Sequence, residues 1–145
     1  GEEGTGRKDI AKQLEKNLFD SGRVTFYMGM QNILLGVEAD IPKDSERVEN
    51  HKEIMRRLGE VGNIMLHAGN LFIVTAIGIR NQDIEILKTT LNGAIETIWV
   101  GEDVTTDLTP DLHLDSFNNT NEAVNKIKDY LGIKGIIFNS WVYSI

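Results

Sequence analysis

The chain has 145 residues, of which 41% are hydrophobic and 26% charged, values typical of one soluble globular domain with a real core. Its formal net charge of −7 argues against a nucleic-acid or anionic-membrane surface, and the absence of cysteine excludes disulfides and thiolate metal sites. No apolar run is long enough to span a membrane and no signal peptide is visible, so we expect a cytoplasmic domain.

The first nine residues, GEEGTGRKD, almost form a phosphate-binding P-loop. The full motif, G-x-x-x-x-G-K-[ST] between a strand and a helix, cradles phosphates with backbone N–H groups, a lysine, and a hydroxyl that holds Mg²⁺. Here Arg7 occupies the lysine position and Lys8 the hydroxyl position. The candidate phosphate- or nucleotide-binding residues are the loop positions Gly1, Gly4, Thr5, Gly6, Arg7 and Lys8.

These two substitutions weaken the motif. Lys8 does not replace the missing lysine, because one step along a helix start rotates a side chain by roughly 100° and shifts it by about 1.5 Å. Arg7 keeps the positive charge but is a planar fork instead of a compact ammonium group. Taken without the rest of the chain, the stretch is equally well a glycine-rich turn that leads into a helix.

Helical and strand patterns alternate after this loop. Residues 9–21 have apolar side chains at helical spacing, and residues 23–30 alternate like a strand. Residues 32–42 indicate a short helix or a loop. A long helix is expected from a cap at Asp44 or Ser45 to about residue 68, ending at Gly69. The predicted buried stripe of this helix is Ile54, Leu58, Val61 and Met65.

Residues 70–79 are almost continuously apolar, which is typical of a strand covered on both faces in a parallel sheet. A helix is predicted from Asn81 or Gln82 to Leu91, and strands over residues 95–100 and 112–115. The last helix is predicted from Thr120 or Asn121 to residue 131. Strands that alternate with helices predict an α/β layered fold with a mostly parallel sheet.

Together these segments resemble the adenylylsulfate (APS) kinase family, P-loop kinases that phosphorylate APS in sulfate activation. After the loop and first helix, residues 46–50 match the family's D-R-x-E-N and residues 56–61 match R-R-I-G-E-V, with about one inserted helical turn between them. Residues 68–76 match A-G-x-I-V-I-T-A, and residues 110–116 and 122–124 match the family's last strand and helix. The resemblance covers essentially the whole chain and implies a P-loop NTPase-like three-layer α/β/α fold.

The departures from the family pattern fall where its chemistry lies. The family's D-G-D-N-V-R reads GMQNIL at residues 29–34, so both carboxylates and the substrate-binding arginine are absent. The I-S-P-Y-R segment has become GIRNQ at residues 78–82, and a short segment, residues 101–109, stands where the family has a basic lid helix. Of the family's substrate-contacting residues, Asn32, Arg47 and Asn50 remain in matching positions.

The resemblance also implies a strand ahead of the loop, which is the central strand of the sheet in P-loop kinases. An unfilled place there would leave unpaired backbone groups on two neighbouring strands. The chain starts with Gly1 instead of methionine. We therefore expect either a fragment of a longer protein, whose first strand is missing, or another segment in the place of that strand.

The main functional expectation is a single APS kinase-like domain over residues 1–145 without kinase activity. Losing the loop lysine, the metal hydroxyl, an acid and a lid costs orders of magnitude in rate. The domain is then kept for a structural, dimerisation or regulatory role, in one polypeptide with a sulfate adenylyltransferase module or as a homodimer. We expect no catalytic residue, no metal-binding residue and no certain cofactor. ATP with Mg²⁺ is expected to bind only if residual nucleotide binding survives.

Two alternatives stay open. One is a divergent kinase that uses Arg7 and Lys8 on the phosphates and Asp9 near the metal, with Asp115 or Glu102 as the metal-binding acid at a strand end. The other is a binding module that holds an anion or nucleotide at the loop without turning it over.

The tail, residues 136–145, has the composition of a strand rather than of a disordered end. Leaving its apolar surface in water is unfavourable by about 25 cal/mol per Å². It is expected to fold back on its own domain or, alternatively, to cover a sheet edge or another chain in a dimer.

Overall fold

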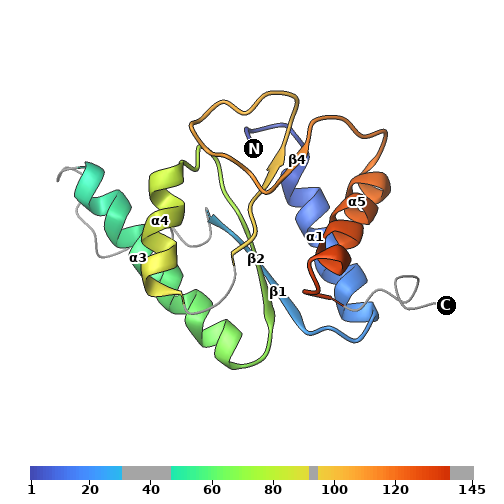
Figure 1. The fold of residues 1–145 in the computed structure, drawn as a ribbon, viewed down its shortest axis with the longest axis horizontal. Helices are drawn as coiled ribbons and strands as arrows, with labels where there is room; N and C mark the ends of the chain where they lie inside the picture. Colours follow the sequence, from blue (N-terminus) through green and yellow to red (C-terminus); the bar gives the residue numbers. More distant parts are fainter. Residues whose placement is uncertain (31–46, 92–94, 138–145) are drawn as a thin grey trace.

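The computed structural model describes residues 1–30, 47–91 and 95–137, with the side chains of residues 47–50 left out (Figure 1). The elements are α1 (Arg7–Asp20), β1 (Thr25–Gly29), α3 (Arg47–His67), β2 (Leu71–Thr75), α4 (Asn81–Thr90), β3 (Ile98–Val100), β4 (Leu112–Leu114) and α5 (Thr120–Ile133). Each helix and strand expected in these ranges is present and differs from its prediction only at the ends. The predicted segment over residues 32–42, the caps Asp44 and Ser45, and the tail beyond residue 137 lie outside the described residues.

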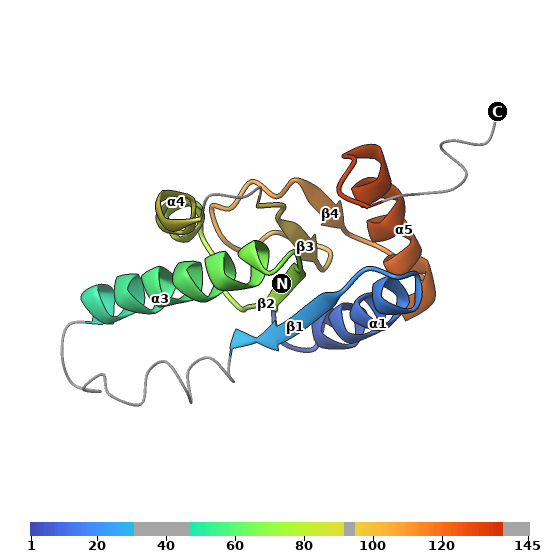
Figure 2. The ribbon, with the colours of Figure 1, turned by 90° about the horizontal axis from the view of Figure 1, so that it is seen from below.

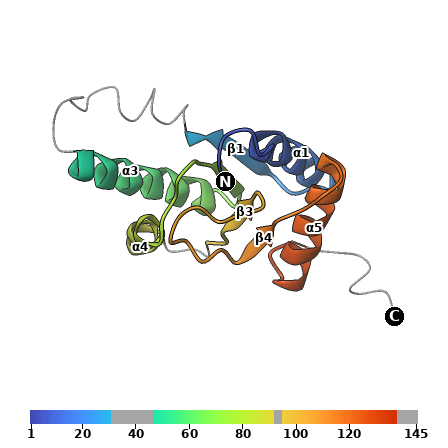
Figure 3. The same ribbon diagram turned by 90° about the horizontal axis from the view of Figure 1, so that it is seen from above.

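The strands lie between two layers of helices, α1 with α5 on one side and α3 with α4 on the other (Figure 1). The views from below and above show the same separation (Figures 2 and 3). Every strand pairing among the described residues is parallel, with Thr25 opposite Leu71 in the first pair and Ile98 opposite Leu112 in the second. The predicted three-layer α/β/α architecture is therefore confirmed. Within the described ranges, the strands form two separate two-stranded sheets, β1–β2 and β3–β4.

The layer of α1 and α5 encloses one apolar cluster. Ile10, Leu14 and Leu18 of α1 follow each other at four-residue spacing and are at most 4% exposed. They pack with the apolar face of α5, in which Val124 and Ile127 are at most 2% exposed. This packing fixes α1, and with it the loop at its N-terminus, against the strands.

The layer of α3 and α4 encloses a second apolar cluster. The residues of α3 that are buried in it differ from the buried stripe predicted for this helix. Ile54 and Leu58 are buried as expected, but Met55 is fully buried, whereas Val61 and Met65 are only half-buried. The helices approach each other through glycines of α3 and residues at the end of α4. A methyl group on Gly59 would lie 2.7 Å from Thr90 Cβ, and one on Gly62 would lie 2.7 Å from Leu91 Cδ2. At Gly59 and Gly62 the backbone of α3 lies directly against the end of α4, where the prediction had placed larger buried side chains.

The end of α3 is as predicted. Gly69 adopts φ 80°, in the left-handed region that favours glycine, and its N–H donates to Leu66 O at 3.0 Å. Asn70 N–H donates to Met65 O at 3.1 Å, so the last turn is closed before β2 begins. Among the described residues, no helix is both long and apolar enough to cross a membrane.

Candidate functional site

The loop ahead of α1 is a left-handed glycine turn. Gly4 has φ 78° and Gly6, the N-cap of α1, has φ 82°, conformations that other residues adopt only with strain. Ile10 N–H donates to Gly6 O at 3.0 Å, which starts the helix. The N–H groups of the first turn of α1 are consequently presented at the loop, an arrangement that attracts anions.

Arg7, at the lysine position of the motif, is folded under the loop. The residue is 8% exposed, and its Nη1 donates to Glu2 O at 3.0 Å. Thr5 Oγ1 donates to the same carbonyl oxygen at 2.8 Å. The guanidinium Nε is buried and has no hydrogen-bond partner among the described residues. The guanidinium group of Arg7 therefore holds the loop through its hydrogen bond to Glu2 O.

Gly1 lies against the end of β3. A methyl group on Gly1 would come within 2.1 Å of Val100 O, so only glycine fits this close approach.

Residues 101–109, where the family resemblance places a lid helix, are held by hydrogen bonds to several neighbouring segments. Trp99 Nε1 donates to Asp103 O at 2.9 Å, and the Thr105 hydroxyl donates to the Glu2 carboxylate of the loop. Farther along, Thr106 Oγ1 donates to Ile79 O at 2.6 Å, and Asn81 Nδ2 donates to Asp107 O at 2.7 Å. This segment therefore bridges the loop and the start of α4 as a fixed connection.

The carboxyl end of β1 is crowded at the position where the family resemblance places an acid. Gly29 is buried, and a Cβ atom on it would lie 3.2 Å from the Tyr27 hydroxyl oxygen. This hydroxyl is held by a hydrogen bond of 3.0 Å with Thr75 Oγ1 on β2. A longer side chain at position 29 thus requires the Tyr27–Thr75 pair to move.

A polar pocket of about 320 Å³ lies at the start of α4. Asp83, only 4% exposed, accepts a hydrogen bond from His51 Nε2 at 2.6 Å and one from Arg80 N–H at 2.9 Å. Lys52 and Gln82 also line this pocket. The sequence analysis did not predict this pocket. A signal for it was present, because Asp83 is an acid at the third position of a helix, where its side chain can accept a hydrogen bond from the N–H of the cap residue. His51 falls in the inserted turn of α3, for which the family pattern offers no guide.

Replacing Asp83 by alanine is expected to lower the free energy of unfolding by about 2–3 kcal/mol, since a buried carboxylate with two hydrogen bonds is lost. Chemical denaturation measures this difference. Asp129→Ala is the matched control, because Asp129 is an exposed aspartate of α5, and its effect is expected to stay within about 0.5 kcal/mol. Equal effects of the two substitutions would contradict the structural role of Asp83.

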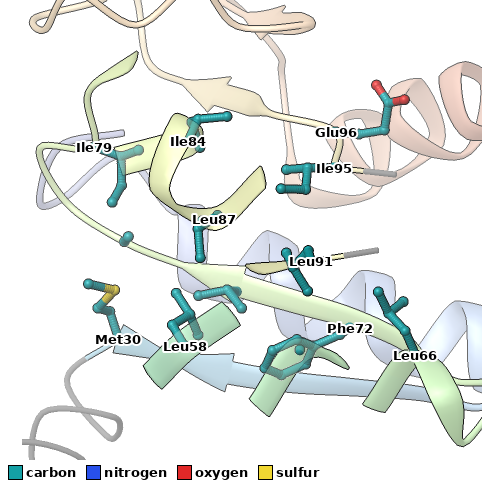
Figure 4. Close-up of a pocket in the computed structure, with 13 residues that line it drawn as sticks. Met30, Leu58, Leu66, Phe72, Ile79, Ile84, Leu87, Leu91, Ile95 and Glu96 are labelled. Atoms are coloured by element: carbon teal, nitrogen blue, oxygen red, sulfur yellow. The ribbon is translucent and has the colours of Figure 1, made fainter. Parts of the chain in front are cut away.

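An apolar cavity of about 190 Å³ lies between α3, β2 and α4 (Figure 4). Leu58, Leu87 and Phe72 line it, together with Ile95 and, at its edge, Glu96. With one carboxylate among apolar side chains, this cavity offers no group suited to a phosphate or sulfate. The candidate site is therefore the glycine loop ahead of α1, together with the carboxyl ends of β1 and β3. It lies on the other side of β2 from this cavity.

The structure places the predicted loop residues ahead of α1 and in its first turn, and their role in binding phosphate or nucleotide stays a prediction. Asn32 lies outside the described residues, and Arg47 and Asn50 are in the first turn of α3, where only the backbone is described. Asp115 and Glu102 are exposed, just after β4 and β3. Within the described ranges, no three His, Asp or Glu side chains are grouped so as to hold a metal ion.

Comparisons with known proteins agree with this arrangement. The sequence profile of the family described as adenylylsulphate kinase matches residues 1–133. The adenylyl-sulfate kinase of Buchnera aphidicola (subsp. Acyrthosiphon pisum) is 37% identical over 83 residues, which are 57% of this chain and 39% of that protein. The bifunctional enzyme NodQ of Azospirillum brasilense is 31% identical over 102 residues, 69% of this chain and 16% of that protein. The chain thus spans less than half the length of these curated relatives.

Solved structures share the fold. The APS kinase CysC of Mycobacterium tuberculosis, as a Cys556Ala mutant, superposes with a TM-score of 0.73 at 20% identity, covering 89% of this chain and 90% of that one. The hexameric APS kinase from Thiobacillus denitrificans gives a TM-score of 0.72 at 20% identity, covering 93% of this chain and 28% of that one. At this level of identity, the similarity shows a common P-loop kinase fold.

Proposed function

The chain belongs to the adenylylsulphate kinase family, and we propose that it is a non-catalytic member, kept for a structural, dimerisation or regulatory role in sulfate activation. The observation that carries the proposal is the placement of Arg7. The residue at the lysine position is 8% exposed and donates to the loop carbonyl of Glu2. It stabilises the loop where the motif's lysine would neutralise the outer phosphates of a nucleotide.

The residues present do not fit ATP with Mg²⁺. The hydroxyl that would ligate the metal is replaced by Lys8, which puts a cation beside a cation site. Glu2 and Glu3 add negative charge beside the phosphate position. No step of phosphoryl transfer is therefore assigned to this loop.

The acceptor side supports the same proposal. An acid that orients the attacking hydroxyl is one of the few groups that phosphoryl transfer needs. Position 29 is a glycine whose Cβ position is 3.2 Å from the Tyr27 hydroxyl. The segment over residues 101–109 is tied to the loop and to α4, so it does not supply a lid that closes over a nucleotide.

We propose further that the domain works as one module of a longer polypeptide, with a sulfate adenylyltransferase module as the expected neighbour. The NodQ relative is named a bifunctional enzyme, of which the match covers 16%. A homodimer is the second proposed assembly, and the hexameric relative from Thiobacillus denitrificans supports assembly in this family.

A second candidate function is an anion-holding module. The N-terminus of α1 and the charge of Lys8 favour a phosphate or sulfate at the loop, whereas Glu2 and Glu3 oppose it. The divergent kinase is less well supported, because Asp115 and Glu102 are exposed residues that follow β4 and β3.

Calorimetric titration with ATP, ADP and APS, each with and without Mg²⁺, tests these functions. We expect that nucleotide binding is absent or weak and is not strengthened by Mg²⁺, because the metal's hydroxyl ligand is missing. The anion-holding module differs in one respect, since it predicts that sulfate or phosphate competes with any nucleotide bound.

The matched variant Arg7→Lys with Lys8→Ser restores the lysine and hydroxyl of the motif. Its nucleotide binding is expected to become stronger and dependent on Mg²⁺, which shows that the assay detects a working loop. Wild-type affinity for ATP that rises about ten-fold on addition of Mg²⁺ would contradict the non-catalytic proposal.

A further inference from the structure

Large apolar side chains are exposed where α1 and α5 end. Phe19, in the last turn of α1, is 62% exposed, and Val24, after the turn that leads into β1, is 49% exposed. Ile133, the last residue of α5, is 73% exposed. Both helices end on the side of the molecule where β1 begins, in the lower right part of Figure 1. We refer to Phe19, Val24 and Ile133 as the end surface.

The end surface continues a buried cluster to the outside. Leu18, next to Phe19, and Leu131, in the last turn of α5, are both buried in the apolar cluster between the two helices. A run of apolar side chains therefore leads from the core to this end of the molecule. Exposed apolar side chains that extend a core in this way are a typical place for another segment to bind.

The chain is turned back onto this cluster when it leaves α5. Gly135 adopts φ 74°, and its N–H donates to Gly132 O at 3.1 Å. Ile136 N–H donates to Leu131 O at 2.9 Å, and the side chains of Ile136 and Ile137 pack against the cluster between α1 and α5. The last described part of the chain thus lies beside the ends of these two helices.

The residues that follow have a composition that suits the end surface. Residues 138–145 read FNSWVYSI and, with residues 135–137, contain no charged side chain. They lie beyond residues 1–133, which the family profile matches. Fully extended, eight residues reach about 26 Å, whereas the axes of two packed helices lie about 8–10 Å apart. The segment is consequently long enough to cross the ends of both α1 and α5.

We propose that residues 138–145 dock on the end surface, across the ends of α1 and α5, with their aromatic side chains against Phe19, Val24 and Ile133. Because the segment is joined to α5 by a short turn, its effective concentration at this surface is in the millimolar range. A second copy of the chain at micromolar concentration does not compete with such a contact. Docking removes the apolar side chains of both the segment and the end surface from water.

Quenching of Trp141 fluorescence by acrylamide tests this contact in the full-length chain. The chain has two tryptophans, Trp99 and Trp141, so Trp99→Phe leaves Trp141 as the only one. We expect its quenching constant to be at least about three-fold lower in the folded protein than in denaturant, because a docked indole ring is largely buried. Equal quenching constants in the two states would overturn the proposal.

Matched substitutions then locate the contact. Phe19→Ser together with Ile133→Ser removes most of the apolar end surface, and we expect the quenching constant of Trp141 to rise about two-fold or more. Ile64→Ser is the control, because Ile64 is 68% exposed but belongs to α3, in the other helix layer. It is expected to leave the quenching constant unchanged. Equal changes in the two variants would show that the segment does not bind the end surface.

Hydrogen exchange provides a second measurement that keeps both tryptophans. The N–H groups of Gly22 and Arg23 are hydrogen-bonded to carbonyl groups in the last turn of α1, both at 2.9 Å. Deleting residues 138–145 is expected to speed exchange at these two amides by about three-fold or more, because their cover is lost. The amides of Gly69 and Asn70, which close α3, are the control and are expected to keep their rates. Unchanged exchange at Gly22 and Arg23 would contradict the proposal.

The protein concentration distinguishes the other occupant of the end surface, a second copy of the chain. If the shielding of Trp141 disappears on dilution while sedimentation shows a dimer dissociating, residues 138–145 cover a partner chain and the proposal is wrong. Shielding that is independent of concentration in a monomer, and that is lost with Phe19→Ser and Ile133→Ser, supports it.

Discussion

APS-dependent ATP turnover by this chain is expected to be undetectable, at least about 10⁴-fold below that of an active APS kinase, because several groups that each contribute 10²–10³ in rate are missing together. The loop lysine and hydroxyl are replaced by Arg7 and Lys8, and Gly29 stands where the family resemblance places an acid. A coupled assay of ADP formation with APS present or absent measures this rate.

Variants separate the two halves of the defect. Restoring the loop with Arg7→Lys and Lys8→Ser is expected to improve nucleotide binding but not turnover, because Gly29 still provides no acid. The single substitution Gly29→Asp is expected to lower the stability of the protein, since the added Cβ would lie 3.2 Å from the Tyr27 hydroxyl oxygen. Turnover by the wild-type chain that disappears in Arg7→Ala would show that the arginine works as a catalytic group and would sink the proposal.

Most of the fold could be predicted because its elements have strong local signals. The α1 pattern of Ile10, Leu14 and Leu18 specifies both the helix and its buried face, and Gly69 specifies where α3 ends. The parallel pairing of β2 follows from its continuous apolar run, although its residues are half-buried and not fully buried. The apolar cavity of about 190 Å³ that Phe72 and Val74 line leaves part of the surface of this strand uncovered.

The site was less predictable, because its character depends on contacts between distant residues. The loop sequence shows that Arg7 replaces lysine, but only the structure shows that its guanidinium turns under the loop to Glu2 O. Similarly, Gly29 reads as a missing acid, whereas the Tyr27–Thr75 hydrogen bond that crowds it joins two strands. His51, in the inserted turn of α3, is hydrogen-bonded to Asp83 of α4, and no local sequence pattern predicts this pair.

Trp99→Ala is expected to lower the free energy of unfolding by about 3–5 kcal/mol, a large part of the stability of a typical domain. Trp99 is 1% exposed and lies in the middle of β3. Removing its ring creates a cavity and also removes the indole donor to Asp103 O, a bond of 2.9 Å that holds the segment after β3. The same segment contacts the loop, because the Thr105 hydroxyl donates a hydrogen bond to the Glu2 carboxylate.

Denaturant unfolding followed by far-UV circular dichroism measures this loss without relying on tryptophan fluorescence. Trp99→Phe retains most of the ring volume and loses only the hydrogen bond, so we expect a smaller decrease of about 1–2 kcal/mol. Phe19→Ala is the control, since Phe19 is 62% exposed and its loss is expected to cost less than about 1 kcal/mol. If Trp99→Ala is no more destabilised than Phe19→Ala, β3 is not the buried support of the loop that this structure indicates.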